Sequence, residues 1–255
     1  MSRLSRFAAA AAAVVLLIGA GCKKNSAPEP PDIQGPLSAR PTDPAAQALL
    51  GWMQQHAARL RALLDEEAEG QDDLSPAGEA AVRAHLRLVA EALAATAGPA
   101  TRGALEDLAD SLPERFAAGE GEVNDELERL GAAAARELDL QFGSEPTGSD
   151  PSIAQMIDRR LRVLAWSRFL LRRVGEAVGD DGFADAALRW MGDRQDQLAN
   201  TIFAMDRRAK EAEIARSGPA AVDDPVLVNR IGQAAMLQAH TRFLVEAVAA
   251  SLTRR

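Results

Sequence analysis

The chain has 255 residues, of which 47% are hydrophobic, 26% charged and 4% aromatic, and its formal net charge is −8. This length allows one domain or two closely packed halves, and it can bury a core without disulfide or metal cross-links. The single cysteine excludes a disulfide framework and a multi-cysteine zinc or iron–sulfur site, and the abundance of alanine over β-branched and aromatic residues favours helices over sheets.

The first 22 residues have the pattern of an export signal. Arg3 and Arg6 precede an apolar run from Phe7 to Ile18, and three small residues separate this run from Cys22. A short basic segment, about a dozen apolar residues and small residues at the end are typical of a secretory signal peptide. The run is too short to cross a hydrocarbon layer of about 30 Å as a permanent helix.

This segment resembles the lipobox of bacterial lipoproteins, in which small residues precede a lipidated cysteine. Gly19 stands where the family usually has leucine, and Ile18 lies one place earlier. The resemblance implies that residues 1–21 are removed as a signal peptide and that Cys22 is lipidated as the first mature residue. Lys23, in place of aspartate, then implies transport to the outer membrane, where the protein would face the periplasm. The alternative is an ordinary cleaved signal peptide that leaves a free thiol.

Residues 22–42 are predicted to form a tether behind the lipidated cysteine. Five prolines with Ser, Asn and Gly between them predict an extended, disordered segment. Removal of residues 1–21 takes away two arginines and leaves a net charge of −10. An acidic mature chain argues against nucleic acid as a partner and against attraction to anionic headgroups, so the acyl chains would have to provide the membrane contact.

The rest of the chain has the pattern of helices. Apolar residues recur at three- and four-residue spacing, and no stretch shows sustained strand-like alternation. We therefore predict an all-α fold, an elongated antiparallel bundle of about six to seven helices. The predicted helices are 44–67, 76–96, 100–111, 122–141, 151–178, 183–216 and 225–253. Four of the starts follow a capping residue and place a proline at the first helical position: Asp43, Ser75, Asp150 and Asp224.

The clearest internal break is GSEPTGSD at 143–150. It separates an acidic helical half, 43–142, from a half with long helices, 150–255, that we expect to pack with it. Residues 43–149 carry 21 acidic and 8 basic side chains, whereas residues 150–255 carry 14 and 16. The imbalance has two explanations: the packed halves complement each other, or an acidic surface faces a partner or cations.

Two alignments of the chain with itself suggest an internal repeat. When positions 150 and 224 are aligned, 168–170 and 242–244 match as Arg-Phe-Leu, and a second alignment places His85 opposite His240. Capped starts then recur about every 75 residues. The hypothesis is three copies of one helical unit, which implies no activity.

His85 and His240 are candidate ligands. Two neutral imidazoles on facing helices could ligate a metal, and a histidine with a methionine could ligate haem. The sequence has neither the Glu-x-x-His pair of di-iron bundles nor the Cys-x-x-Cys-His haem attachment motif, and His56 is the only other histidine. We therefore predict no cofactor and no metal site. The alternative is a periplasmic bundle that binds haem or a metal through His240, with or without His85.

A candidate partner face lies on the predicted helix 151–178. Arg162, Trp166, Phe169 and Arg173 fall on one side of this helix. A Trp/Phe pair flanked by arginines has the composition of a protein-interaction hot spot, here for an envelope protein. The alternative is a central helix that is buried on two faces, with its arginines paired with the acidic half.

The remaining motifs give no sign of catalysis. The acidic run from Asp65 to Asp73 lacks the spacing of a calcium loop, and we interpret it as a solvated turn between two helices. No nucleophile elbow or phosphate-binding loop occurs. We therefore expect a lipid-anchored envelope protein that acts as a binding or structural helical module and not as an enzyme.

Overall fold

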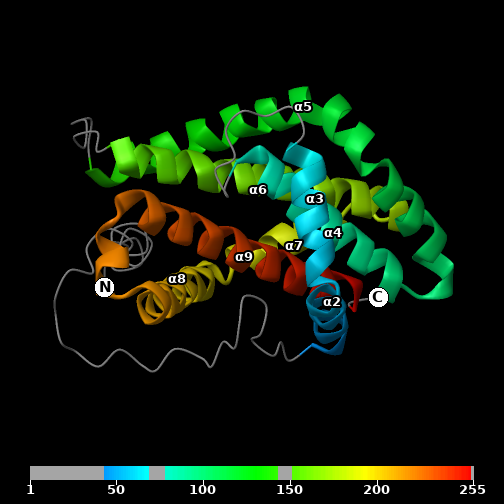
Figure 1. The fold of residues 1–255 in the computed structure, drawn as a ribbon. Coiled ribbons are helices and arrows are strands. Elements are labelled where there is room, and N and C mark those ends of the chain that lie inside the picture. The colour runs from blue at the N-terminus through cyan, green and yellow to red at the C-terminus, as the bar shows by residue number, and fades with distance from the viewer. Residues whose placement is uncertain (1–42, 69–77, 143–150, 254–255) are drawn as a thin grey trace. The chain divides into compact units, whose positions relative to one another are not determined.

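The computed structural model describes residues 43–68, 78–142 and 151–253 (Figure 1). Over these ranges the chain forms α-helices and one short 3-10 helix, without a strand, so the predicted all-α fold is confirmed. The elements are α2 (Pro44–Gln55), α3 (Ala57–Ala68), α4 (Glu79–Thr96), α5 (Pro99–Phe142), α6 (Pro151–Val178), α7 (Phe183–Gly192), α8 (Gln195–Ser217), the 3-10 helix η1 (Pro219–Asp223) and α9 (Pro225–Leu252).

The described residues divide into two compact units. Residues 194–239 form the smaller unit, in which η1 packs against α8. Residues 43–193 and 240–253, with the gaps given above, form the larger unit. The boundary that we predicted at 143–150 lies outside the described residues, and α5 and α6 on either side of it belong to the larger unit.

Two of the predicted helix caps are confirmed. Asp43 Oδ1 accepts hydrogen bonds from the backbone N–H groups of Ala45 (2.8 Å) and Ala46 (3.2 Å), and α2 begins at the following proline. Asp224 Oδ1 accepts from Val226 N (2.9 Å) at the start of α9. These carboxylates satisfy N–H groups that have no partner inside the helix. The caps predicted at 75 and 150 lie outside the described residues, and the repeat stays a hypothesis.

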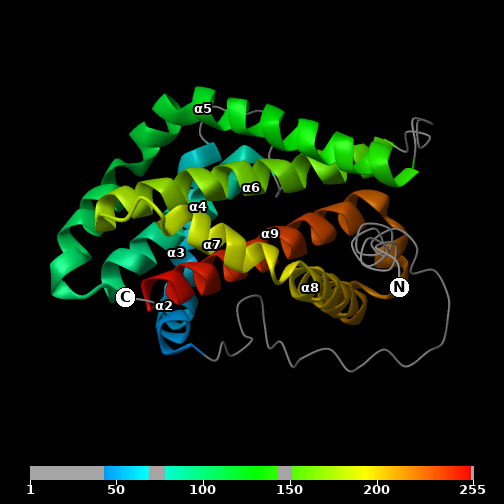
Figure 2. The same ribbon diagram turned by 180° about the vertical axis from the view of Figure 1, so that it is seen from behind.

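The prediction of two helices over 100–111 and 122–141 is wrong, because α5 is one helix of 44 residues that contains Pro113. Proline in a helix interior costs about 3 kcal/mol, but Pro113 is exposed and the apolar stripe continues past it through Leu112, Phe116 and Val123, which are buried. The helix bends along its course (Figures 1 and 2), as a helix that contains proline commonly does.

Two other predicted helices are each divided. The predicted helix 44–67 is interrupted at His56, whose backbone N–H and ring Nδ1–H both donate to the carbonyl oxygen of Trp52, at 3.0 and 2.8 Å. Its ring also stacks on Trp52, with the centroids 4.0 Å apart. The predicted helix 183–216 is interrupted at residues 193–194, directly after Gly192. Both interruptions lie at positions without a proline, so the proline spacing of the sequence did not mark them.

The core of the larger unit surrounds α4 and the last part of α9. In α4, 13 of the 18 residues are buried, and every residue from His240 to Ala249 of α9 is buried. Such helices are covered on all sides. In α2 one apolar stripe is buried, which consists of Ala46, Leu49, Leu50 and Met53.

Candidate functional site

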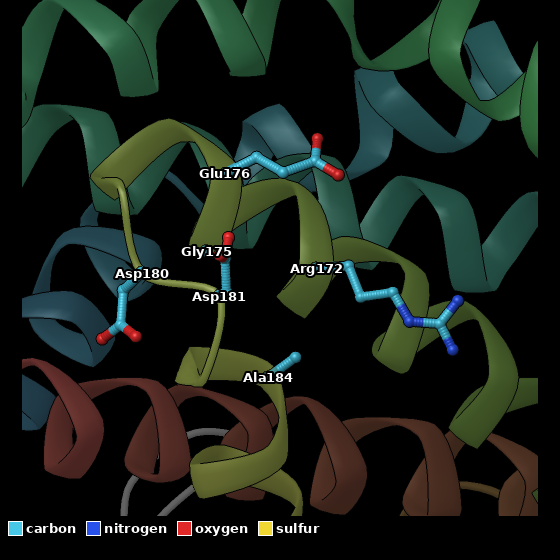
Figure 3. A pocket seen from close by; sticks show the side chains of 6 residues that line it. All are labelled: Arg172, Gly175, Glu176, Asp180, Asp181 and Ala184. Carbon is cyan, nitrogen blue, oxygen red and sulfur yellow. The ribbon is translucent and has the colours of Figure 1, made fainter.

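A pocket of about 140 Å³ lies at the corner where α6 turns into α7 (Figure 3). Gly179 ends α6 with φ +70°, a conformation that favours glycine. The N–H of Asp180 then donates to the carbonyl oxygen of Gly175 (2.8 Å). A Cβ on Gly175 would lie 2.7 Å from the carbonyl oxygen of Asp180, so this close turn needs a glycine. The pocket is lined by Arg172, Gly175, Glu176, Asp180, Asp181 and Ala184.

The charged groups of this pocket do not converge on a common point. Figure 3 shows the end groups of Arg172, Glu176 and Asp180 pointing in different directions. Arg172 is paired with two glutamates of α5, and Glu176 accepts from Arg173 (2.6 Å). The volume is also smaller than the roughly 300–1,000 Å³ of sites for drug-sized ligands. The geometry therefore supports no catalytic constellation in this pocket.

Among the described residues, no group of three or more His, Cys, Asp or Glu side chains is arranged to hold a metal ion. His85 is 8% exposed, and its Nδ1–H donates to the carbonyl oxygen of Ala81 (2.8 Å). His240 is 4% exposed, and neither of its ring nitrogens has a hydrogen-bond partner in the part of the chain that is described. The two histidines that the sequence alignment placed opposite each other therefore have different hydrogen bonding.

Both buried histidines are neutral at physiological pH. Burial lowers the pKa of His85 to about 4, and the bond to Ala81 opposes this change only in part. Burial and the positive charge of Arg160 lower the pKa of His240 to about 3. A neutral imidazole is the form that binds metals, but the nearby guanidinium disfavours a cation beside His240.

The candidate partner face is not a free surface of the chain. Trp166 and Phe169 are 1% and 2% exposed, and both pack against Phe116 of α5, with centroid distances of 5.3 and 6.0 Å. Arg162 pairs with Glu79 (2.8 Å) and Asp158, and Arg173 pairs with Glu122 and Glu176. Of the two interpretations of these residues, the burial and the ion pairs support the helix that is packed within the chain and not a free partner face.

The contact between α5 and α6, which we call the α5–α6 seam, combines ion pairs with an aromatic cluster. Figures 1 and 2 both show the two helices side by side. Arg168, Arg172 and Arg173 of α6 pair with Glu122 and Glu126 of α5. The aromatic cluster is Phe116, Trp166 and Phe169.

At this seam α5 can approach α6 closely because residue 119 is a glycine. A Cβ at Gly119 would lie 2.3 Å from Cε2 of Phe169. The guanidinium of Arg173 covers the ring of Phe169 at 4.8 Å, and that of Arg83 lies 5.7 Å from the ring of Trp166, both within the range of cation–π attraction. Ring, glycine and guanidinium groups together fill the space between the helices.

Sequence reasoning missed a second group of ion pairs, between α3 and α4, which we call the α3–α4 seam. It consists of Arg59–Glu91, Arg83–Glu67, Arg87–Glu66 and Arg87–Glu67. Glu66 and Glu67 belong to the acidic run that we interpreted as a solvated turn. This interpretation is wrong for them, because they lie in α3, within the predicted helix 44–67, and pair with arginines of α4. The sequence signal for these pairs was the spacing of Arg83 and Arg87, which places two positive charges one helical turn apart on the same side of α4.

Cys22, the predicted lipidation site, lies outside the described residues. No helix in the described ranges is long and apolar enough to cross a membrane. The chain was compared with known protein families, with curated proteins and with solved structures, and none of the three comparisons finds a match. The described residues thus define an all-α protein, and its function has to be inferred from its own residues.

Proposed function

We propose that this protein is a bacterial lipoprotein of the cell envelope, a helical module with a binding or structural role that is held at a membrane by acyl chains on Cys22. The observation that carries the proposal is the order of residues at the N-terminus: arginines, an apolar run, three small residues and the only cysteine. A lone cysteine at the end of an export signal has a direct use as an acylation site, and two acyl signals hold a soluble body at a membrane.

The helical body supports a role other than catalysis. About half of its described charged side chains form ion pairs within the chain, as at the α3–α4 and α5–α6 seams. The described pocket has no converging set of donors and acceptors. A body of this kind acts through its position and its helix surfaces.

Expression of the full chain in a bacterium with an outer membrane, together with an alkyne-labelled fatty acid, tests the proposal. We expect the wild type to carry the label, to begin at Cys22 and to fractionate with the outer membrane. The variant Cys22→Ser should accumulate as an unlabelled precursor. A wild type that is cleaved but unlabelled, with a free thiol, would establish the ordinary signal peptide instead.

Lys23→Asp is a matched control for this experiment. It leaves the cysteine and the apolar run unchanged, so labelling and cleavage should equal those of the wild type. The resemblance to lipoproteins implies that an aspartate directly after the cysteine retains the protein at the inner membrane. Loss of the label in this variant would contradict acylation governed by the N-terminal pattern, because only the sorting residue has changed.

A further inference from the structure

Helix α3 is attached to the larger unit by a short apolar contact, in which Leu60 and Leu64 are half-buried beside Leu63, and by ion pairs. Of its 12 residues only Leu63 is buried, whereas α2, of the same length, buries four residues. An apolar stripe is what ordinarily holds a surface helix on its domain. In α3 this stripe is short, and the ion pairs of the α3–α4 seam add to it.

The ion pairs of this seam are well formed. Arg83 Nε donates to Glu67 Oε2 (3.0 Å), and Arg87 donates to Glu67 Oε1 (3.1 Å) and to Glu66 Oε2 (2.8 Å). Glu67 therefore receives both arginines of α4, and its side chain is only 10% exposed. Burial acts to raise the pKa of Glu66, but the hydrogen bonds from Arg87 and Arg59 outweigh it and leave that pKa below its ordinary value.

A fourth contact of the seam ties the start of α3 to α4. Arg59 Nη2 lies 3.0 Å from Glu91 Oε1, and Arg59 Nε lies 3.2 Å from both carboxylate oxygens of Glu91. Two nitrogens of one guanidinium thus face one carboxylate, which fixes direction as well as distance. Charged contacts therefore lie at both ends of α3, on either side of Leu63.

The chain also provides a hinge for α3. His56 separates α2 from α3 with φ −107° and ψ 29°, and its ring is bound to Trp52 of α2. Helix α2 stays anchored by its four buried residues. A change of the backbone dihedral angles at His56 would therefore change the direction of α3 and leave the buried stripe of α2 in place.

We propose that α3 is a cover helix that opens about His56 when its ion pairs with α4 are screened or outcompeted, and that the opening uncovers Arg87. Arg87 has only Glu66 and Glu67 as carboxylate partners in the described structure, so it loses both when α3 leaves. Arg83 keeps contacts with Glu79 and Glu120 and with the ring of Trp166, so the rest of α4 stays in place. The inference does not depend on lipidation.

Hydrogen exchange of the full-length protein, followed by mass spectrometry, tests this proposal. Charges separated by more than a Debye length are screened, and this length falls from about 30 Å at 0.01 M salt to about 3 Å at 1 M. Between these two salt concentrations we expect the amides of α3 to exchange about tenfold faster, as the loss of several partly exposed ion pairs predicts. The amides of α6, which has as many ion pairs but a buried aromatic face, should change less than about twofold.

A pair of matched variants separates the seam from a general effect of salt. Glu67→Gln keeps the shape of the side chain but removes the charge that Arg83 and Arg87 share, so α3 should exchange rapidly even at low salt. Glu122→Gln removes in the same way the charge shared by Arg172 and Arg173, and it should leave the exchange of α5 and α6 slow.

Two results would overturn the proposal. One is that α3 exchanges as slowly as α4 at both salt concentrations and in Glu67→Gln. The other is that α3, α4 and α6 accelerate together, because α3 would then belong to the same cooperative unit as the core. Should Glu67→Gln not fold, Glu91→Gln removes the carboxylate of α4 that pairs with Arg59 at the other end of α3, and it tests the same opening.

Discussion

The α3–α4 seam and the α5–α6 seam have the same kind of ion pairs but differ in how much apolar surface is buried beside them. In both, arginines of one helix contact glutamates of the other, and in both a single glutamate receives two arginines, Glu67 in one and Glu122 in the other. Beneath the first lies one buried residue of α3, Leu63. Beneath the second lie Trp166 and Phe169, both nearly inaccessible to solvent.

The difference shows that ion pairs orient helices, whereas apolar burial holds them together. A partly exposed pair contributes about 0–1 kcal/mol. Full burial of a large apolar side chain contributes about 1.5–3 kcal/mol, and aromatic pairs add about 0.5–1.5 kcal/mol each. The α5–α6 seam therefore belongs to the core, and the α3–α4 seam can open while the core remains folded.

The largest expected effect comes from truncating a side chain of the aromatic cluster in the α5–α6 seam. Trp166→Ala should lower the free energy of unfolding by about 3–5 kcal/mol, because it leaves a cavity beside Phe116 and Phe169. Urea titration followed by far-UV circular dichroism measures this change. Phe203→Ala, at a position 52% exposed, is the control and should change stability by less than about 0.5 kcal/mol. A Trp166→Ala effect as small as that of the control would contradict the distinction between the two seams.

Acid should weaken the fold in two steps, first through the core histidines and then through the seams. The pKa values of His85 and His240 are about 4 and about 3 in the folded chain, below the 6.5 of a free histidine, so the unfolded state takes up protons first. Stability should thus be lost as the pH falls below about 6.5, by about 2 kcal/mol for each histidine between pH 7 and 5.

The second step involves carboxylates of the seams. Burial acts to raise the pKa of Glu126, but a hydrogen bond from Arg129 and the charges of Arg168 and Arg172 leave it below its ordinary value of 4.5, and Glu66 is shifted in the same direction. The stability that these groups contribute is present above pH 4.5 and is lost as the pH falls through their folded pKa values. Urea titrations at several pH values measure both steps. His85→Gln should flatten the loss between pH 7 and 5, and an unchanged slope would contradict this assignment.

A smaller effect is expected where α5 approaches α6. In Gly119→Ala the new Cβ would overlap the ring of Phe169, at a cost of about 1–3 kcal/mol, and the higher helix propensity of alanine offsets up to about 1 kcal/mol of this. Gly121→Ala lies on the same helix with no atom within 4 Å of the new Cβ, and should stabilise the protein. Opposite signs in the melting temperatures of the two variants would confirm the close approach, and equal signs would contradict it.

Local signals predicted much of the fold, whereas the packing of α6 needed the structure. Asp43 and Asp224 mark helix starts because a cap acts within one turn of the chain. Trp166 and Phe169 could be assigned to a partner face or to the core, because a helical wheel shows which residues share a side but not what covers that side. Pro113 led us to predict two helices where α5 is one, because the packing of α5 outweighs the low helix propensity of proline.

The ion pairs of the α3–α4 seam were beyond prediction for a different reason. They join residues 16 to 32 positions apart in the sequence, and a helical pattern does not show that the helix with Glu66 and Glu67 lies beside Arg83 and Arg87. The candidate site on α6 was identified from the right residues, but its interpretation depended on α5, whose course the sequence left open.

The smallest effect is expected from added metals or haem, for which His240 in the buried part of α9 is the candidate ligand. We predict that zinc, copper and haem do not raise the melting temperature of the wild type in a saturable way, because the described residues hold no group of three ligands and Arg160 is positively charged beside this histidine. His240→Gln should leave the helical content unchanged and alter stability only by the roughly 0.5–3 kcal/mol of an ordinary core substitution. Calorimetric titration of the wild type and this variant measures both expectations. A saturable stabilisation of the wild type that His240→Gln abolishes would show that the unpaired ring nitrogens serve a ligand, and that the core around α9 has a chemical role that neither seam has.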